Sequence, residues 1–169
     1  MSVNAQAAWE KRAYTWMDAC EDEIRRWKDC SSFKLGLFKL DWSSRRRSSR
    51  GGLYGNAPGI SIAMYPVTRD PQGVARCYEY RSFDGDPVIG GFYYRDANLK
   101  LGMHICHEMA HAVQFYAARI LDTQPIDRPH GSSFKKPYAA LRQTILNPRL
   151  ESQQELEEEY KNMLKEIER

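Results

Sequence analysis

The residues with the clearest capacity for chemistry form the HExxH sequence His107-Glu108-Met109-Ala110-His111. It sets two imidazoles four residues apart with a carboxylate beside the first. Four residues advance an α-helix by about 400°, so the two histidines would project from one helix face and reach a single metal ion together. Such a pair, next to a carboxylate able to act as a general base, is typical of zinc hydrolases. The sequence therefore predicts a metal-dependent hydrolase.

The surrounding residues predict the helix that this geometry needs. Apolar residues recur at alternating steps of four and three, which describes one stripe of a helix: Leu99, Met103, Cys106, Ala110, Val113, Ala117 and Ile120. The two histidines and Glu108 fall beside this stripe, where they can line a cleft. His104 lies one turn before His107 and is an alternative ligand, although extra histidines of this kind more often support a ligand or face solvent. The competing interpretation is a pair of core histidines that bind no metal.

A catalytic zinc site usually has three protein ligands and keeps a fourth position open, so a third ligand must come from elsewhere. Extension of the motif to HExxHxxGxxH would require glycine and histidine where the chain has Gln114 and Ala117. The only histidine downstream is His130, in a loop bracketed by proline and glycine. We expect His130 to be the third ligand, with Asp122 and Asp127 as alternative oxygen ligands.

The segment that contains His130 makes the pattern recognisable. It reads His130-Gly131-Ser132-Ser133-Phe134. HExxH followed by HGxxF at this distance resembles the SprT-like (Spartan-type) zinc metallopeptidases, and the match covers residues 105–138. A weaker similarity extends back through residues 49–52 and 59–63, so roughly half of the chain is covered.

The resemblance implies one Zn²⁺ ion bound by His107, His111 and His130, with Glu108 as the catalytic base. It also implies a compact zincin-like domain and an endopeptidase that hydrolyses peptide bonds with zinc-activated water. Its substrates would be proteins, including proteins bound or crosslinked to DNA, as in DNA–protein crosslink repair. The developing oxyanion needs a further hydrogen-bond donor. The sequence leaves open whether this donor is an arginine or one of three tyrosines, Tyr93, Tyr116 and Tyr138.

Three features depart from the family pattern. The four cysteines form no CxxC pair, so the zinc ribbon that follows the core in many relatives is not expected. The chain carries one short acidic helix after its core instead of a long tail. An extra segment, Val74–Tyr94, precedes the metal helix, and its role is not explained by the resemblance.

The overall pattern predicts an α+β fold in a single domain spanning residues 1–169, with a core of about 1–150 and a C-terminal helix in 151–169. The expected elements are a long helix over about 5–28, strands near 33–37 and 60–64, a hairpin over 74–94, the HExxH helix over about 99–120, a helix over 134–145, and a last helix begun by the capping residues Ser152 and Glu155.

Composition favours an intracellular protein. The chain has 169 residues, 42% of them hydrophobic, and a net charge of +3. No signal peptide and no apolar run long enough to span a membrane are visible, and the scattered cysteines are typical of reduced thiols. We therefore expect a cytoplasmic protein without a membrane partner. The oligomeric state is left open.

Positive charge is concentrated in one Ser/Gly-rich loop that contains Arg45, Arg46, Arg47 and Arg50. Arginines in such a loop can contact a phosphate backbone, which favours DNA as a partner beside the protein substrate. This supports an alternative from another class, a catalytically idle nucleic-acid-binding module in which zinc only stabilises the fold. The two hypotheses differ at Glu108, which a structural zinc site does not need. A hydrolase of a non-peptide bond is a third hypothesis.

Overall fold

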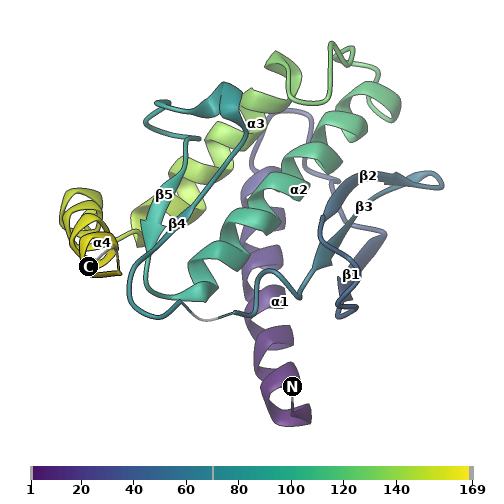
Figure 1. The fold of residues 1–169 in the computed structure, drawn as a ribbon. Coiled ribbons are helices and arrows are strands. Elements are labelled where there is room, and N and C mark those ends of the chain that lie inside the picture. Colours follow the sequence, from purple (N-terminus) through teal and green to yellow (C-terminus); the bar gives the residue numbers. More distant parts are fainter. Residues whose placement is uncertain (1, 70, 168–169) are drawn as a thin grey trace.

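The computed structural model describes residues 2–69 and 71–167 as an α+β fold. Its helices are α1 Val3–Arg25, α2 Ala97–Arg119, α3 Ser132–Leu141 and α4 Gln153–Ile167. Its strands are β1 Leu37–Asp41, β2 Arg50–Tyr54, β3 Ala57–Ala63, β4 Ala75–Cys77 and β5 Phe92–Tyr94. Figure 1 shows α2 in the middle, with β1–β3 on one side and β4, β5 and α3 on the other. The predicted α+β class is confirmed, and the small antiparallel or mixed sheet expected with it is mixed.

The predicted long N-terminal helix is present as α1, and its apolar stripe is buried against α2. The Ser2 hydroxyl accepts a hydrogen bond from the Ala5 backbone N–H and caps the helix. The Trp16 indole donates to Asn98 at 3.0 Å. At the crossing of α1 and α2, a Cβ at Gly102 would lie 2.6 Å from the Trp16 ring. A glycine at this position therefore allows the helix that carries HExxH to pack closely on the scaffold.

The three-stranded sheet is mixed and has β3 at its centre. β1 pairs with β3 in parallel, and β2 pairs with it antiparallel at the other edge. The inward residues of β3, including Ile60 and Ile62, are fully buried. This sheet packs against α2 through β2 and β3. It therefore fixes one side of the helix that carries the candidate metal ligands.

Two sequence predictions for this region were wrong. The alternation that began at Phe33 predicted a strand over 33–37, but the strand starts at Leu37. Phe33 is buried instead by edge-to-face packing on Tyr116, and the Leu35 backbone N–H donates to the Glu21 carboxylate at 2.7 Å. The stretch from Arg50 was interpreted as loop, yet it forms β2. The alternation of apolar and polar residues that begins at Phe33 therefore reflects the burial of Phe33 and not a strand.

The predicted hairpin over 74–94 is only partly correct. Its ends pair as antiparallel strands β4 and β5, with Ala75 opposite Tyr94 and Cys77 opposite Phe92. They are not joined by a tight turn. Residues 78–91 form a long connection that contains a 3₁₀ turn at Arg81–Phe83 and crosses towards the HExxH helix.

The C-terminal elements follow the prediction closely. α3 continues through a π-helical turn at Arg142–Leu146 and a 3₁₀ turn at Asn147–Arg149, after which α4 begins. The Gln153 amide accepts from the Tyr93 N–H at 2.7 Å and donates to the Tyr93 carbonyl at 3.1 Å, which docks α4 on β5. No helix within residues 2–69 and 71–167 is both long and apolar enough to cross a membrane.

Candidate metal centre

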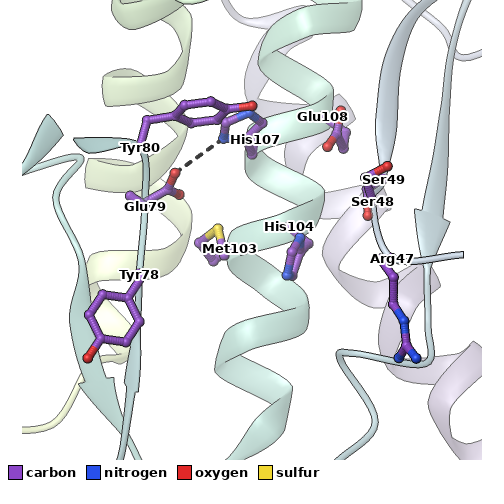
Figure 2. Close-up of a pocket in the computed structure, with 10 residues that line it drawn as sticks. All are labelled: Arg47, Ser48, Ser49, Tyr78, Glu79, Tyr80, Met103, His104, His107 and Glu108. Atoms are coloured by element: carbon purple, nitrogen blue, oxygen red, sulfur yellow. Dashed lines mark ion pairs between the residues drawn. The ribbon is translucent and has the colours of Figure 1, made fainter. Parts of the chain in front are cut away.

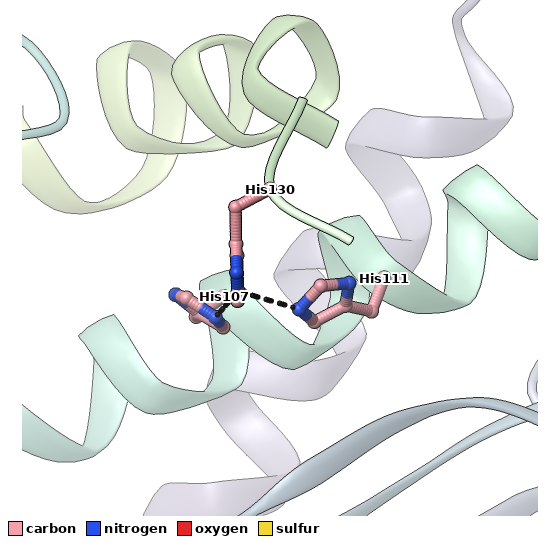
Figure 3. A group of neighbouring side chains, drawn as sticks. All are labelled: His107, His111 and His130. Carbon is pink, nitrogen blue, oxygen red and sulfur yellow. Dashed lines mark hydrogen bonds between the residues drawn. The ribbon is translucent and has the colours of Figure 1, made fainter. Parts of the chain in front are cut away.

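Three histidines from two parts of the chain converge on one point. The Nε2 atoms of His107 and His111 lie 3.2 Å and 3.0 Å from the Nε2 atom of His130. One ring nitrogen from each of the three residues lies within 4.8 Å of the others, a spacing that can hold one metal ion. Figure 3 shows the His130 ring reaching down to the two histidines of α2. The three predicted ligands are therefore brought together.

A side-chain clamp fixes the loop that carries His130. The Asp127 carboxylate accepts hydrogen bonds from the Ser132 backbone N–H at 2.8 Å, the Ser132 hydroxyl at 3.1 Å and the Ser133 hydroxyl at 2.5 Å. The Ser133 hydroxyl, with the other bonds, holds the pKa of Asp127 well below its usual value. A Cβ at Gly131 would lie 2.1 Å from this carboxylate. The glycine and serines that follow His130 therefore position the loop.

The alternative ligands lie outside the histidine cluster. Among the residues that the structure describes, the only group able to hold a metal ion is formed by the three histidines. Asp127 is engaged by the loop, and Asp122 is an exposed residue with a left-handed φ of 52°. His104 lines the neighbouring pocket, and burial lowers its pKa to about 4.

The second nitrogen of His111 is held by an amide. Its Nδ1 lies 3.3 Å from Gln114 Oε1, and the Gln114 amide nitrogen donates to the Arg128 carbonyl at 3.1 Å and to Ser133 Oγ at 2.7 Å. An acceptor at Nδ1 leaves Nε2 free to bind a metal. Burial lowers the pKa of His111 to about 4, which keeps the ring neutral. Gln114 thus orients a candidate ligand and connects it to the His130 loop.

The second nitrogen of His107 is held by a carboxylate. Its Nδ1 lies 3.5 Å from Glu79 Oε2, and the other Glu79 oxygen accepts a hydrogen bond from the Tyr138 hydroxyl. That hydroxyl accepts from Arg142 at 3.1 Å, and Arg142 is only 2% exposed. Burial alone would raise the pKa of Glu79, but His107, Tyr138 and Arg142 together lower it, so Glu79 stays ionised. A buried, charged network therefore backs this candidate ligand.

The predicted base, Glu108, is also buried beside the cluster. Burial raises its pKa to about 7, against the opposing effects of His107 and the Gly51 N–H. β2 approaches so closely here that a Cβ at Gly51 would lie 2.0 Å from the Glu108 carbonyl oxygen. The glycine-rich strand that was not predicted therefore forms the wall next to the base.

Two hollows adjoin the histidines. One, of about 330 Å³, is drawn in Figure 2, and the other has about 270 Å³. Both are lined by four of the same residues, Ser49, Tyr80, His107 and Glu108. They lie between the segment that leads into β2 and the segment that follows β4. The candidate metal centre is therefore accessible from both sides.

The four arginines of the predicted DNA-contacting loop differ in their surroundings. Arg46 forms an ion pair with Asp41 at 3.1 Å. The Arg47 guanidinium lies 4.4 Å from the centre of the Tyr65 ring and also lines the larger hollow. Arg45, Arg47 and Arg50 are exposed. The basic loop therefore borders the cleft.

The tyrosines proposed as oxyanion donors are engaged elsewhere. The Tyr116 hydroxyl lies 2.9 Å from Ser32 Oγ, the Tyr138 hydroxyl is held by Glu79, and Tyr93 packs on Tyr160. Two tyrosine rings contact the cluster: that of Tyr138, whose centre lies 5.2 Å from that of His107, and that of Tyr80, whose centre lies 3.9 Å from that of His130. Of these two, Tyr80 lines both hollows. Sequence reasoning missed Tyr80 because no periodicity distinguishes it from the other aromatic residues of the 74–94 segment.

Comparison with known proteins yields no match to this chain among family models, curated protein sequences or solved structures. The resemblance to SprT-like metallopeptidases therefore depends on the chain's own sequence motifs, chiefly the HExxH and HGxxF segments.

Proposed function

We propose that this chain is a zinc-dependent endopeptidase of the SprT-like type, with a zincin-like arrangement around the HExxH helix. The observation that carries the proposal is the convergence of His107, His111 and His130 beside a buried carboxylate, Glu108, at an accessible cleft. A structural zinc site is usually closed by four protein ligands, whereas a catalytic site has three. Three ligands next to a carboxylate favour catalysis.

The donor set fits zinc. Zinc–imidazole bonds of about 2.0–2.1 Å in a tetrahedral site separate the ligand nitrogens by about 3.3 Å. The two Nε2 pairs at 3.2 Å and 3.0 Å are close to that separation. Burial lowers the pKa of His130 as well as that of His111, so these rings are neutral and each has a nitrogen lone pair able to bind a metal. Imidazole also suits copper, nickel and iron, so the identity of the metal is part of the proposal.

The chain's own residues then have distinct roles. When bound, zinc would acidify water and polarise the scissile carbonyl. Glu108 accepts the proton of the attacking water and passes it to the leaving amine, and a pKa raised towards neutrality suits both transfers. Glu79 and Gln114 keep the Nδ1 hydrogens of the two helix ligands in place, so both Nε2 atoms face the same point.

Proteins attached to DNA are the substrates that the surroundings favour. The cleft is open on both sides of the histidines, which suits an extended, unfolded polypeptide. Arg47 borders this cleft, so DNA held by the basic loop would lie close to the peptide being cut. The alternative is a zinc-stabilised nucleic-acid-binding module. It would use the same three histidines and the same basic loop, but it would not need Glu108.

The metal part of the proposal is tested by substituting two histidines separately. His130→Ala removes one of the three ligands and should abolish stoichiometric zinc binding, as measured by elemental analysis of the purified protein. His104→Ala is the matched control, since His104 lies on the same helix outside the cluster, and it should keep the metal. Undiminished zinc in His130→Ala would contradict the ligand assignment.

The enzyme part of the proposal is tested by an activity assay on an unfolded polypeptide, with and without single-stranded DNA. The zinc-loaded chain should cleave it, a chelator should stop the reaction, and added zinc should restore it. Absence of zinc-dependent cleavage under both conditions would favour the binding module.

A further inference from the structure

The connection between β4 and β5 brings two adjacent residues against one histidine. Glu79 contacts the Nδ1 atom of His107, and the next residue, Tyr80, packs its ring on the face of the same imidazole. The Glu79 end is anchored, because its carboxylate is bonded to Tyr138, which is bonded to the buried Arg142. The backbone that carries Tyr80 is thereby fixed relative to the candidate ligands.

The Tyr80 ring lies over the histidine cluster. Its centre is 5.6 Å from that of His107, with the two planes only 19° apart, and 3.9 Å from that of His130. Tyr80 lines both hollows, together with His107 and Glu108. Figure 2 shows its side chain extending across His107 with the hydroxyl on the side of Glu108. Despite these contacts the residue is 50% exposed, so part of its side chain is accessible to a substrate.

Peptide hydrolysis at this site would need a donor near both the metal and the base. Attack of water on the scissile carbonyl places negative charge on the carbonyl oxygen, and a fixed hydrogen bond to that oxygen stabilises the transition state more than the ground state. The phenol O–H of Tyr80 is a suitable neutral donor. The hydroxyls of Tyr116 and Tyr138 are held by Ser32 and Glu79.

We propose that Tyr80 is a catalytic residue of this site, whose hydroxyl donates a hydrogen bond to the carbonyl oxygen of the scissile peptide as that oxygen becomes negatively charged. This inference rests on the proposed peptidase function. The hydroxyl keeps its proton throughout, while Glu108 carries the proton of the attacking water to the leaving amine. The segment that supplies Tyr80 is the one that departs from the SprT-like pattern, so this chain would complete its site with a group of its own.

The test compares Tyr80→Phe with the wild-type chain. Phenylalanine keeps the ring that packs on the histidines and removes only the hydroxyl, so zinc content should not change. Loss of one such donor should lower kcat by about 10²-fold and leave KM nearly the same. Tyr14→Phe is the matched control, since Tyr14 is also 50% exposed but lies on α1 against Phe38, and its kinetics should equal those of the wild type.

A binding measurement separates this role from a packing role. A phosphonamidate peptide, whose tetrahedral phosphorus mimics the transition state, should bind Tyr80→Phe about 10²-fold more weakly than wild type, whereas a product peptide should bind both equally. Wild-type kcat in Tyr80→Phe, or a fall in kcat that matches a loss of zinc, would overturn the inference. If the wild-type chain cleaves no polypeptide, the result would instead contradict the proposed peptidase function itself.

Discussion

The two candidate ligands on α2 are supported in different ways. His107 is backed by Glu79, a buried charge connected through Tyr138 to the buried Arg142. His111 is backed by Gln114, a neutral amide bonded to the His130 loop. A carboxylate at Nδ1 increases the electron density that the ring offers a metal and adds negative charge near it, whereas an amide mainly fixes orientation. Glu79 therefore supports His107 mainly through its charge, whereas Gln114 supports His111 mainly by fixing the orientation of the ring.

The largest effect is expected from removing the charge behind His107. Glu79→Ala should destabilise the metal-free fold by about 1–3 kcal/mol, because the buried Tyr138 hydroxyl loses its acceptor and the buried Arg142 loses a nearby negative charge. It should also weaken metal binding by about 100-fold. Denaturant unfolding in the presence of chelator measures the first effect, and metal competition measures the second. Unchanged stability would show that the Tyr138–Arg142 pair is satisfied without Glu79.

A milder substitution isolates the charge from the packing. Glu79→Gln keeps the volume and one acceptor oxygen, so the fold should lose less stability than in Glu79→Ala. Metal affinity should still fall by more than about tenfold, since the negative charge near the ion is gone. Equal metal affinity in wild type and Glu79→Gln would mean that Glu79 only orients the ring, as Gln114 does.

A smaller effect is expected on the His111 side. Gln114→Leu fills the same space but frees the Nδ1 hydrogen of His111 and leaves the Arg128 carbonyl and Ser133 hydroxyl without the amide. Metal affinity should fall by about tenfold, the lower end for such interactions, and less than in Glu79→Gln. The ranking of these two variants in one competition assay is the observation that decides the comparison. A larger loss in Gln114→Leu would reverse it.

The smallest change concerns the edge of the cleft and DNA. Arg45→Ser combined with Arg50→Ser removes two of the three exposed arginines and leaves Arg47 and the Arg46–Asp41 ion pair intact. DNA binding should weaken regardless of sequence, and the slope of log K against log salt should flatten by about 0.7–0.9 for each phosphate that the variant no longer neutralises. Lys11→Ser with Lys34→Ser, both exposed, is the charge-matched control. A slope equal to that of the wild type would make these arginines ordinary surface residues.

The difference between the ligands and their supports also explains what could be predicted from the sequence. His107, Glu108 and His111 are set by helical spacing, and His130 by a short local motif, so each could be named in advance. The partners behind them could not. Glu79 reaches His107 from a different element, and no local pattern indicates that contact. Gln114 lies on the HExxH helix itself. In the sequence, however, it showed only that the motif does not extend to HExxHxxGxxH, which needs glycine at this position.

The errors in the fold have a related cause. β2 was not predicted because Gly51 and Gly52 with their polar neighbours are typical of a loop. The strand is explained by antiparallel pairing with β3 and by close packing on the Glu108 backbone of α2. The strand near Phe33 was predicted from an alternation of apolar and polar residues. In the structure, Phe33 is buried by packing on Tyr116 without being part of a strand. In both places, packing against α2 or α1 decided the structure.

The most direct test of the central claim is the rate at which zinc-loaded Glu108→Gln cleaves an unfolded polypeptide, measured beside wild type at matched zinc content. The substitution keeps the size of the side chain and removes the proton acceptor. We predict that the variant binds the same one equivalent of zinc and that its cleavage rate falls by about 10² to 10⁴. Cleavage by Glu108→Gln at the wild-type rate would contradict the account.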